Sequence, residues 1–152
     1  MTSEILPKSN ILTRFFSGGV AASPFELWLL EEFVRHLPVE LAAPSRAQLA
    51  AVTLVQRDPE WIETRFYRKV AGRVDWTGIP LLPIDSYEAK IIGLTIKPSP
   101  HDKAIHSVLH SVGRHLFMMT FDTSIRRYAS LSSATVQDVR HSWRGHLTTG
   151  GA

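Results

Sequence analysis

Four of the seven histidines in this chain lie between residues 99 and 115, in the segment SPHDKAIHSVLHSVGRH, and imidazoles are common ligands of transition metals. A serine-proline pair at its start and a glycine at residue 113 predict a helix over about residues 100–112. On that helix Asp102, His106 and His110 follow one another at intervals of four residues. Two imidazoles one turn apart can bind one ion, and the carboxylate can bind it or orient a ring. This spacing predicts a metal site and, with it, a metal-dependent enzyme.

The same histidine spacing is also typical of the solvated side of an ordinary helix. The metalloprotease motif His-Glu-x-x-His places a general base between its two ligands, whereas the residues between His106 and His110 are Ser, Val and Leu. With Asp102 used as a helix cap, further ligands would have to come from His101, His115 or His141. The sequence therefore favours a protein without a cofactor and keeps a bound transition metal as the alternative.

A second candidate site is basic and lies within residues 45–69, which superficially look like a DNA-reading helix-turn-helix. Four of its cations could meet phosphates: Arg57, Arg65, Arg68 and Lys69. The match is poor in detail, because Leu54 stands where the turn usually needs glycine and Pro59 interrupts the second helix. A nucleic-acid-binding transcriptional regulator is therefore an alternative function rather than the first choice.

The third candidate site is on the first predicted helix, which begins at Ser23-Pro24 and should end near residue 36, before a proline. Ser23 caps it, and Glu26 completes a capping box three residues later. Its apolar residues cover more than half of its circumference, so it is either buried on two sides or completed by another chain. A tryptophan lies among its charges, as in protein interfaces, and the predicted partner-binding residues are Trp28, Glu31, Glu32 and Arg35. In the alternative, the amino-terminal arm covers this helix and Arg35 stacks on Trp28.

The elements that would position these sites are read from periodicity. A second helix should start at Ser45, with Gln48 as capping partner, and run on through Leu54. Residues 59–71 fit either a helix or a strand, with a slight preference for a strand over 63–70 that turns at Ala71-Gly72. Strands are predicted at AKIIGLTIKP, RHLFMMTFD and SIRRYASL, and a closing helix at SSATVQDVRHSWRG, residues 132–145.

Together these elements predict an α+β fold of one domain: N-terminal helices, a mostly antiparallel sheet of three to five strands and a C-terminal helix. The domain should span residues 23–147, between an N-terminal arm (1–22) and a flexible tail (148–152). The chain has no cysteine, which excludes disulfides and thiolate chemistry, and its net charge of +3 is weak evidence for nucleic acid. No apolar run is long enough to span a membrane, and no secretory signal is recognisable, so a cytoplasmic protein is expected.

The function that this sequence favours is binding rather than catalysis. No nucleophile elbow, phosphate-binding loop or dinucleotide fingerprint occurs in the 152 residues. We therefore expect a non-enzymatic, bacterial-type protein that binds a macromolecular partner, as an adaptor, an accessory regulator or a toxin-neutralising immunity protein does. The expected partner is another protein or a second copy of this chain; nucleic acid is weakly supported, and no membrane contact is expected.

Overall fold

The computed structural model describes residues 22–142, which form a single α+β domain. Two helices, α2 (Pro24–His36) and α3 (Val39–Ala51), come first and the strands follow. Most of the predicted arm and the whole of the predicted tail lie outside the described residues. Within the described part, neither helix has the length and apolar character needed to cross a membrane.

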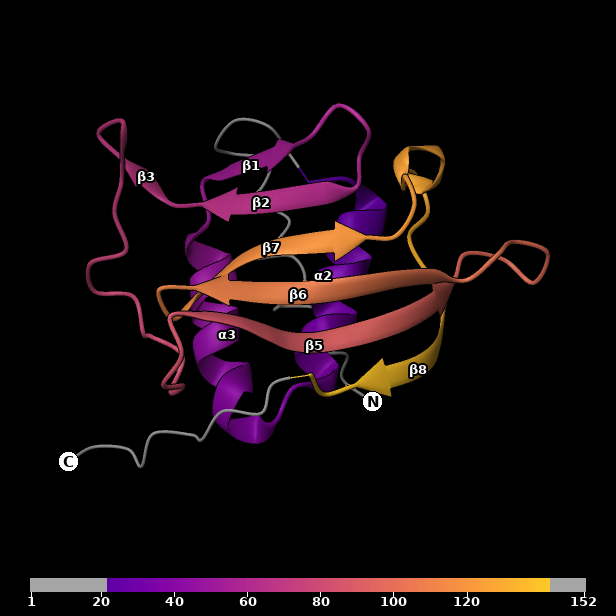
Figure 1. Ribbon diagram of the computed structural model, residues 1–152. Helices are drawn as coiled ribbons and strands as arrows, with labels where there is room; N and C mark the ends of the chain where they lie inside the picture. The colour runs from indigo at the N-terminus through magenta and orange to yellow at the C-terminus, as the bar shows by residue number, and fades with distance from the viewer. Residues whose placement is uncertain (1–21, 143–152) are drawn as a thin grey trace, which may run out of the picture.

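The strands form one six-stranded antiparallel sheet, more than the three to five predicted, in the order β1-β2-β7-β6-β5-β8. Both helices cover the same face of this sheet, which lies in front of them in Figure 1. Within residues 22–142 no helix covers the other face, which we call the open face. The six strands are β1 (Leu54–Arg57), β2 (Glu63–Tyr67), β5 (Glu88–Lys97), β6 (Ile105–Val112), β7 (His115–Phe121) and β8 (Thr135–Arg140).

Helix α2 begins where the sequence predicted. The Ser23 hydroxyl accepts a hydrogen bond from the Glu26 amide, and the Glu26 carboxylate accepts one from the Ser23 amide, so the capping box is confirmed. Phe25, Leu29 and Phe33 are fully buried among the apolar side chains of the core. Because both the sheet and α3 contact this helix, it is buried on two sides within one chain.

Helix α3 begins at Val39, six residues before the predicted cap, and contains Pro44. Ser45 is a fully buried residue inside the helix, so the predicted capping role is wrong. The buried side chain of Gln48 instead donates hydrogen bonds to the carbonyl oxygens of Pro80 (2.7 Å) and Arg114 (3.1 Å) and accepts one from the amide of Leu116 (2.8 Å). It therefore fixes the start of β7 and a long loop against the helix layer.

The predicted helix over residues 100–112 is wrong, because residues 105–112 form β6. Ile105 and Leu109 point inward and are buried. Val108 and Val112 point outward, since they pair with outward-facing neighbours on β5. Together the inward and outward residues have the i, i+3, i+4, i+7 spacing of an apolar helix face, which is why the sequence predicted a helix for this extended segment.

The predicted C-terminal helix is also wrong over its described residues, because residues 135–140 form β8, the outermost strand beside β5. Val136 and Val139 have the i, i+3 spacing of a helix face. In the sheet that spacing follows from a register shift that leaves Gln137 out of the ladder, so both valines face inward although three residues separate them. Trp143 and Gly145, which were to complete the helix, lie outside the described residues.

Two smaller predictions had different outcomes. The segment 124–131 contains a short 3-10 helix, Arg126–Tyr128, instead of the predicted strand. Residues 63–67 form a strand as preferred, and β3 (Lys69–Val70) pairs with β4 (Arg73–Val74) across Ala71-Gly72, as predicted. This hairpin makes a separate two-stranded ladder that projects beyond one end of the main sheet (Figure 1).

Candidate functional site

The structure separates the three residues of the predicted metal site. His106 and His110 both point to the open face of β6, but four residues along a strand place them about 13 Å apart. Asp102 lies in the loop between β5 and β6, where its carboxylate accepts hydrogen bonds from Ser99 Oγ and Arg127 Nη2, both at 2.7 Å. Across residues 22–142, no three His, Asp or Glu side chains are grouped as metal ligands.

Each of the two histidines instead has a neighbour on the adjacent strand. His106 Nδ1 lies 3.0 Å from Thr95 Oγ1, its Nε2 lies 4.0 Å from Asp122 Oδ2, and its side chain is 63% exposed. His110 Nε2 lies 2.9 Å from Thr120 Oγ1. Burial lowers the pKa of His110, and the positive charge of Lys90 lowers it further. A neutral imidazole is therefore favoured near the centre of the open face.

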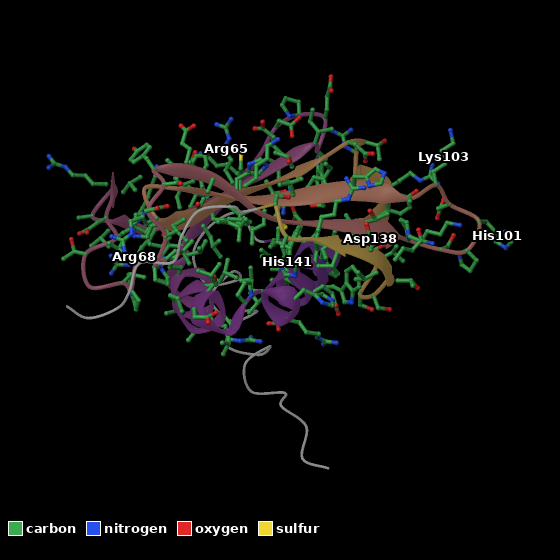
Figure 2. All side chains as sticks on the ribbon, turned by 60° about the horizontal axis from the view of Figure 1, so that its bottom comes forward. Arg65, Arg68, His101, Lys103, Asp138 and His141 are labelled. Atoms are coloured by element: carbon green, nitrogen blue, oxygen red, sulfur yellow. The ribbon has the colours of Figure 1, made fainter. Side chains whose placement is uncertain are left out.

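Asp102 belongs to a polar hollow of about 430 Å³ at one end of the sheet. The hydrogen bond from Ser99 lowers the pKa of Asp102, with a smaller contribution from Arg127. The Arg127 guanidinium also lies 4.8 Å from the centre of the Tyr128 ring. His101 and Lys103 extend from the same end of the sheet, opposite to Arg68 (Figure 2). The carboxylate is thus held as an anion by one guanidinium and by hydroxyl groups of its own chain.

The predicted helix-turn-helix is wrong, because residues 54–67 contain the strand pair β1–β2. Arg57 faces the helices and pairs with Glu26, with 2.6 Å between Nη2 and Oε1 and side-chain exposures of 12% and 0%. The Glu26 carboxylate also accepts a hydrogen bond from the Thr64 hydroxyl at 2.5 Å. Arg57 is therefore part of the interior and is not presented to a phosphate backbone.

The other three predicted phosphate contacts lie apart from one another. Arg65 is on the open face, paired with Glu63 at 2.9 Å, and points away from the helices (Figure 2). Arg68 donates a hydrogen bond to the carbonyl oxygen of Asp75 at the base of the β3–β4 hairpin. Lys69 is exposed on β3. No single element presents the four cations that the sequence grouped together.

The predicted partner-binding residues of α2 are engaged within the chain. The Trp28 ring stacks on Phe25 with 5.9 Å between ring centres. Glu31 pairs with Arg46 at 3.6 Å, while Glu32 lies 3.7 Å from both Arg35 and His36. Arg35 is thus paired with an acid. A partner that bound these four side chains would have to replace the contacts that they make within the chain.

Sequence reasoning missed the open face of the sheet, whose central strands carry apolar side chains outward. Tyr67 and Phe117 meet edge to face with 5.7 Å between ring centres, and the Arg65 guanidinium lies 5.9 Å from the Phe117 ring. Met118 follows directly, because a register shift opposite His110 brings two consecutive β7 residues to this face. We call the half-buried outward residues the apolar band: Leu54, Tyr67, Val108, Val112, Phe117 and Met118.

Charged residues surround the apolar band in a regular order. Three strands each carry an acid and a base two residues apart on the open face, namely Glu63/Arg65 on β2, Glu88/Lys90 on β5 and Asp138/Arg140 on β8. Gly93, opposite Val108, has no side chain and leaves a hollow of about 630 Å³ beside Lys90 and Asp138. Val108 and Val112 are visible in the sequence, but they indicate an apolar outer face only once residues 105–112 are known to form a strand.

Comparison with known proteins finds no match: neither a family model, nor a curated protein, nor a solved structure is similar to this chain. The chemistry of its surfaces is therefore the basis for any functional argument.

Proposed function

We propose that this chain is a non-enzymatic protein-binding domain, of the adaptor, regulator or immunity-protein kind, and that the open face of its sheet is the docking surface. The proposal depends on one observation. An antiparallel sheet that is solvated on one face normally alternates apolar residues inward with polar residues outward. Here Val108, Val112, Phe117 and Met118 break that rule on the two central strands, β6 and β7.

The composition of the open face supports binding to a protein. Its apolar band combines Tyr, Phe, Met and Val with an arginine over an aromatic ring, and aromatic residues, Met and Arg are enriched in protein interfaces. The acid and base pairs form a polar rim around it, as interfaces have. Apolar side chains that gather on the outer face of a sheet and are bordered by polar residues mark an interaction site.

The charge of this face argues for a protein partner over nucleic acid. Each of the three rim bases has an acid on its own strand, and Arg65 contacts its acid directly, 2.9 Å away. A phosphate-binding surface would present a net excess of cations instead. The nucleic-acid alternative remains open at the β3–β4 hairpin, where Lys69 and Arg73 are exposed.

The test replaces Met118 by lysine, which puts a charge in the middle of the apolar band. Tagged wild-type chain and Met118→Lys are each recovered from native-host extract, and co-eluting proteins, the chain itself included, are identified by mass spectrometry, with nucleic acid and metal measured in the same eluate. The protein that co-elutes with the wild-type chain is then purified, and its affinity for the wild type and for Met118→Lys is measured by titration. We expect at least about tenfold weaker binding to Met118→Lys, because a buried unpaired charge is costly.

The matched control is Trp28→Ala, on the helix layer and away from the open face. We expect it to keep the partner. Loss of the partner in Trp28→Ala but not in Met118→Lys would transfer the docking site to α2, as the sequence suggested. Retention of nucleic acid with an affinity that falls steeply as salt rises would favour the nucleic-acid alternative.

A further inference from the structure

We infer that the partner of the open face is a second copy of this chain, packed sheet against sheet about a two-fold axis that lies between the sheets and perpendicular to their strands. This inference rests on the proposed function, since it assigns an occupant to the same docking surface. In such an arrangement each strand lies across the same strand of the partner. Where the axis passes between two neighbouring rows of residues that run across the strands, each row lies opposite the other row of the partner's sheet.

The charge order of β2 fits this two-fold axis. The register places Arg65, Met118, His110 and Lys90 in one row across the sheet, and Glu63, Thr120, Val108 and Gly93 in the next. Exchange of the two rows sets each Arg65 opposite the partner's Glu63. An axis parallel to the strands would instead set Arg65 against Lys90, two like charges, so charge complementarity selects the perpendicular axis.

The hollow beside Gly93 fits the same exchange of rows. Lys90 on β5 would lie over the partner's Gly93, which is the one position in its row without a side chain. Asp138 and Arg140 both line the hollow and pair with each other at 3.6 Å, so they present no net charge to the incoming lysine. A long side chain of one row is thus met by the position of the other row that has no side chain.

The size of the open face is adequate for a dimer. Six strands of four to ten residues, about 4.8 Å apart, give a face of roughly 600 Å² in projection, before the relief of the side chains is added. A stable interface buries about 800 Å² on each partner. Sheets that pack face to face lie about 10 Å apart, which leaves room for the side chains of the apolar band to interdigitate.

The test uses charge reversal and mixing. Glu63→Arg gives a chain with two bases at positions 63 and 65, and Arg65→Glu gives a chain with two acids. Each variant should repel its own copy and lose at least about tenfold in self-association relative to wild type. An equimolar mixture of the two should recover a dimer, because opposite charges then face each other. Sedimentation equilibrium at micromolar concentrations measures all three samples and the wild type.

Two further variants serve as a control and as an independent check. Arg73→Glu reverses a charge on the β3–β4 hairpin, outside the open face, and should dimerise like the wild type. Gly93→Arg fills the hollow opposite Lys90 and should weaken the dimer without affecting the fold, since an added Cβ there meets only ordinary contacts, the nearest at 3.5 Å. Circular dichroism melting of each variant confirms that a monomeric result comes from a folded chain.

The outcomes separate this inference from the proposed function. A wild type that stays monomeric while Met118→Lys loses a different protein overturns the second copy and leaves the docking face intact. A dimer that persists in both charge reversals, or a mixture that does not recover one, also overturns the inference. If Met118→Lys changes neither self-association nor the binding of any other protein, the proposed function itself is wrong.

Discussion

Glu26 and Arg57 lie 31 residues apart in the sequence and 2.6 Å apart in the structure, where they join α2 to β1 beneath the sheet. The carboxylate is fully buried, and it also accepts hydrogen bonds from the amide of Ser23 and the hydroxyl of Thr64. A capping residue of the first helix is thus also the anion of an interior ion pair. Helix start and sheet edge are fixed by the same side chain.

Replacement of Arg57 by methionine should destabilise the fold by about 3–5 kcal/mol, because it leaves the Glu26 carboxylate buried without its cation. Urea denaturation measures the loss. Arg35→Met is the matched control: that arginine pairs with Glu32 at the surface of α2, away from the open face, where an ion pair contributes less than about 1 kcal/mol. Equal losses in the two variants would contradict an interior role for Arg57.

Replacement of Gln48 by leucine should cost about 2–4 kcal/mol, because the carbonyl oxygens of Pro80 and Arg114 and the amide of Leu116 lose their partner. Hydrogen exchange at the Leu116 amide should accelerate more than exchange in the middle of β6. Gln56→Leu makes the same change at an exposed residue of β1 that lacks these contacts, and it should be nearly neutral. An unchanged Leu116 amide in Gln48→Leu would exclude the proposed link.

Stability should fall as the solution becomes acidic, in part because of His110. Burial lowers its pKa in the folded state, so the unfolded chain binds a proton first as the pH drops below about 6.5. The stabilising contribution is therefore present above that pH and is lost as the pH falls through the folded pKa. His110→Gln should show a shallower decline of the melting temperature as the pH falls below about 6.5. Part of the dependence of the melting temperature on pH should remain in this variant, because burial also lowers the pKa of His115.

Replacement of Ala71 by glycine should stabilise the β3–β4 hairpin by about 0.5–1 kcal/mol. Ala71 has φ 51° and Gly72 has φ 78°, the two positive angles that a tight two-residue hairpin turn requires, and a Cβ is strained there. The reverse change, Gly72→Ala, should destabilise by about 1 kcal/mol through the backbone alone, because no atom lies within 4 Å of the added Cβ. Chemical denaturation of both variants, expected to shift in opposite directions, checks the turn.

Removal of one imidazole should leave the metal content of the protein unchanged. His106 and His110 are about 13 Å apart along β6, too far to share an ion. We therefore expect wild type and His106→Ala, each incubated with zinc or nickel and then desalted, to carry equal metal by elemental analysis. A stoichiometric loss in His106→Ala would contradict the strand geometry and restore the metal site.

Local signals in the sequence predicted local structure well. Ser23, Pro24 and Glu26 fixed the start of α2 because all the atoms of the cap lie within one turn. The continuous apolar run around Ile91 and Ile92 predicted a strand, and a register shift at that point accounts for two consecutive buried residues. Each of these features is decided by neighbours close in sequence.

The errors came from positions where the sheet departs from strict alternation. Val136 and Val139 imitate a helix face because Gln137 is left out of the ladder. Val108 and Val112 imitate one because the open face is itself apolar, so the feature proposed here to bind a partner is the one that concealed the strand. The Glu26–Arg57 pair depends on tertiary contact across 31 residues, which periodicity does not report.

Strand β8 lies at one edge of the sheet, and this position affects how further copies of the chain could add to it. It has six residues, and its pairing slips by one where Gln137 is passed over, so it offers an uneven template to any strand that would add beyond it. Lateral extension of the ladder beyond β8, one route to fibrils, is therefore discouraged. The inferred two-fold packing of two open faces is instead a closed arrangement, because each copy then has no second open face to offer to a third copy.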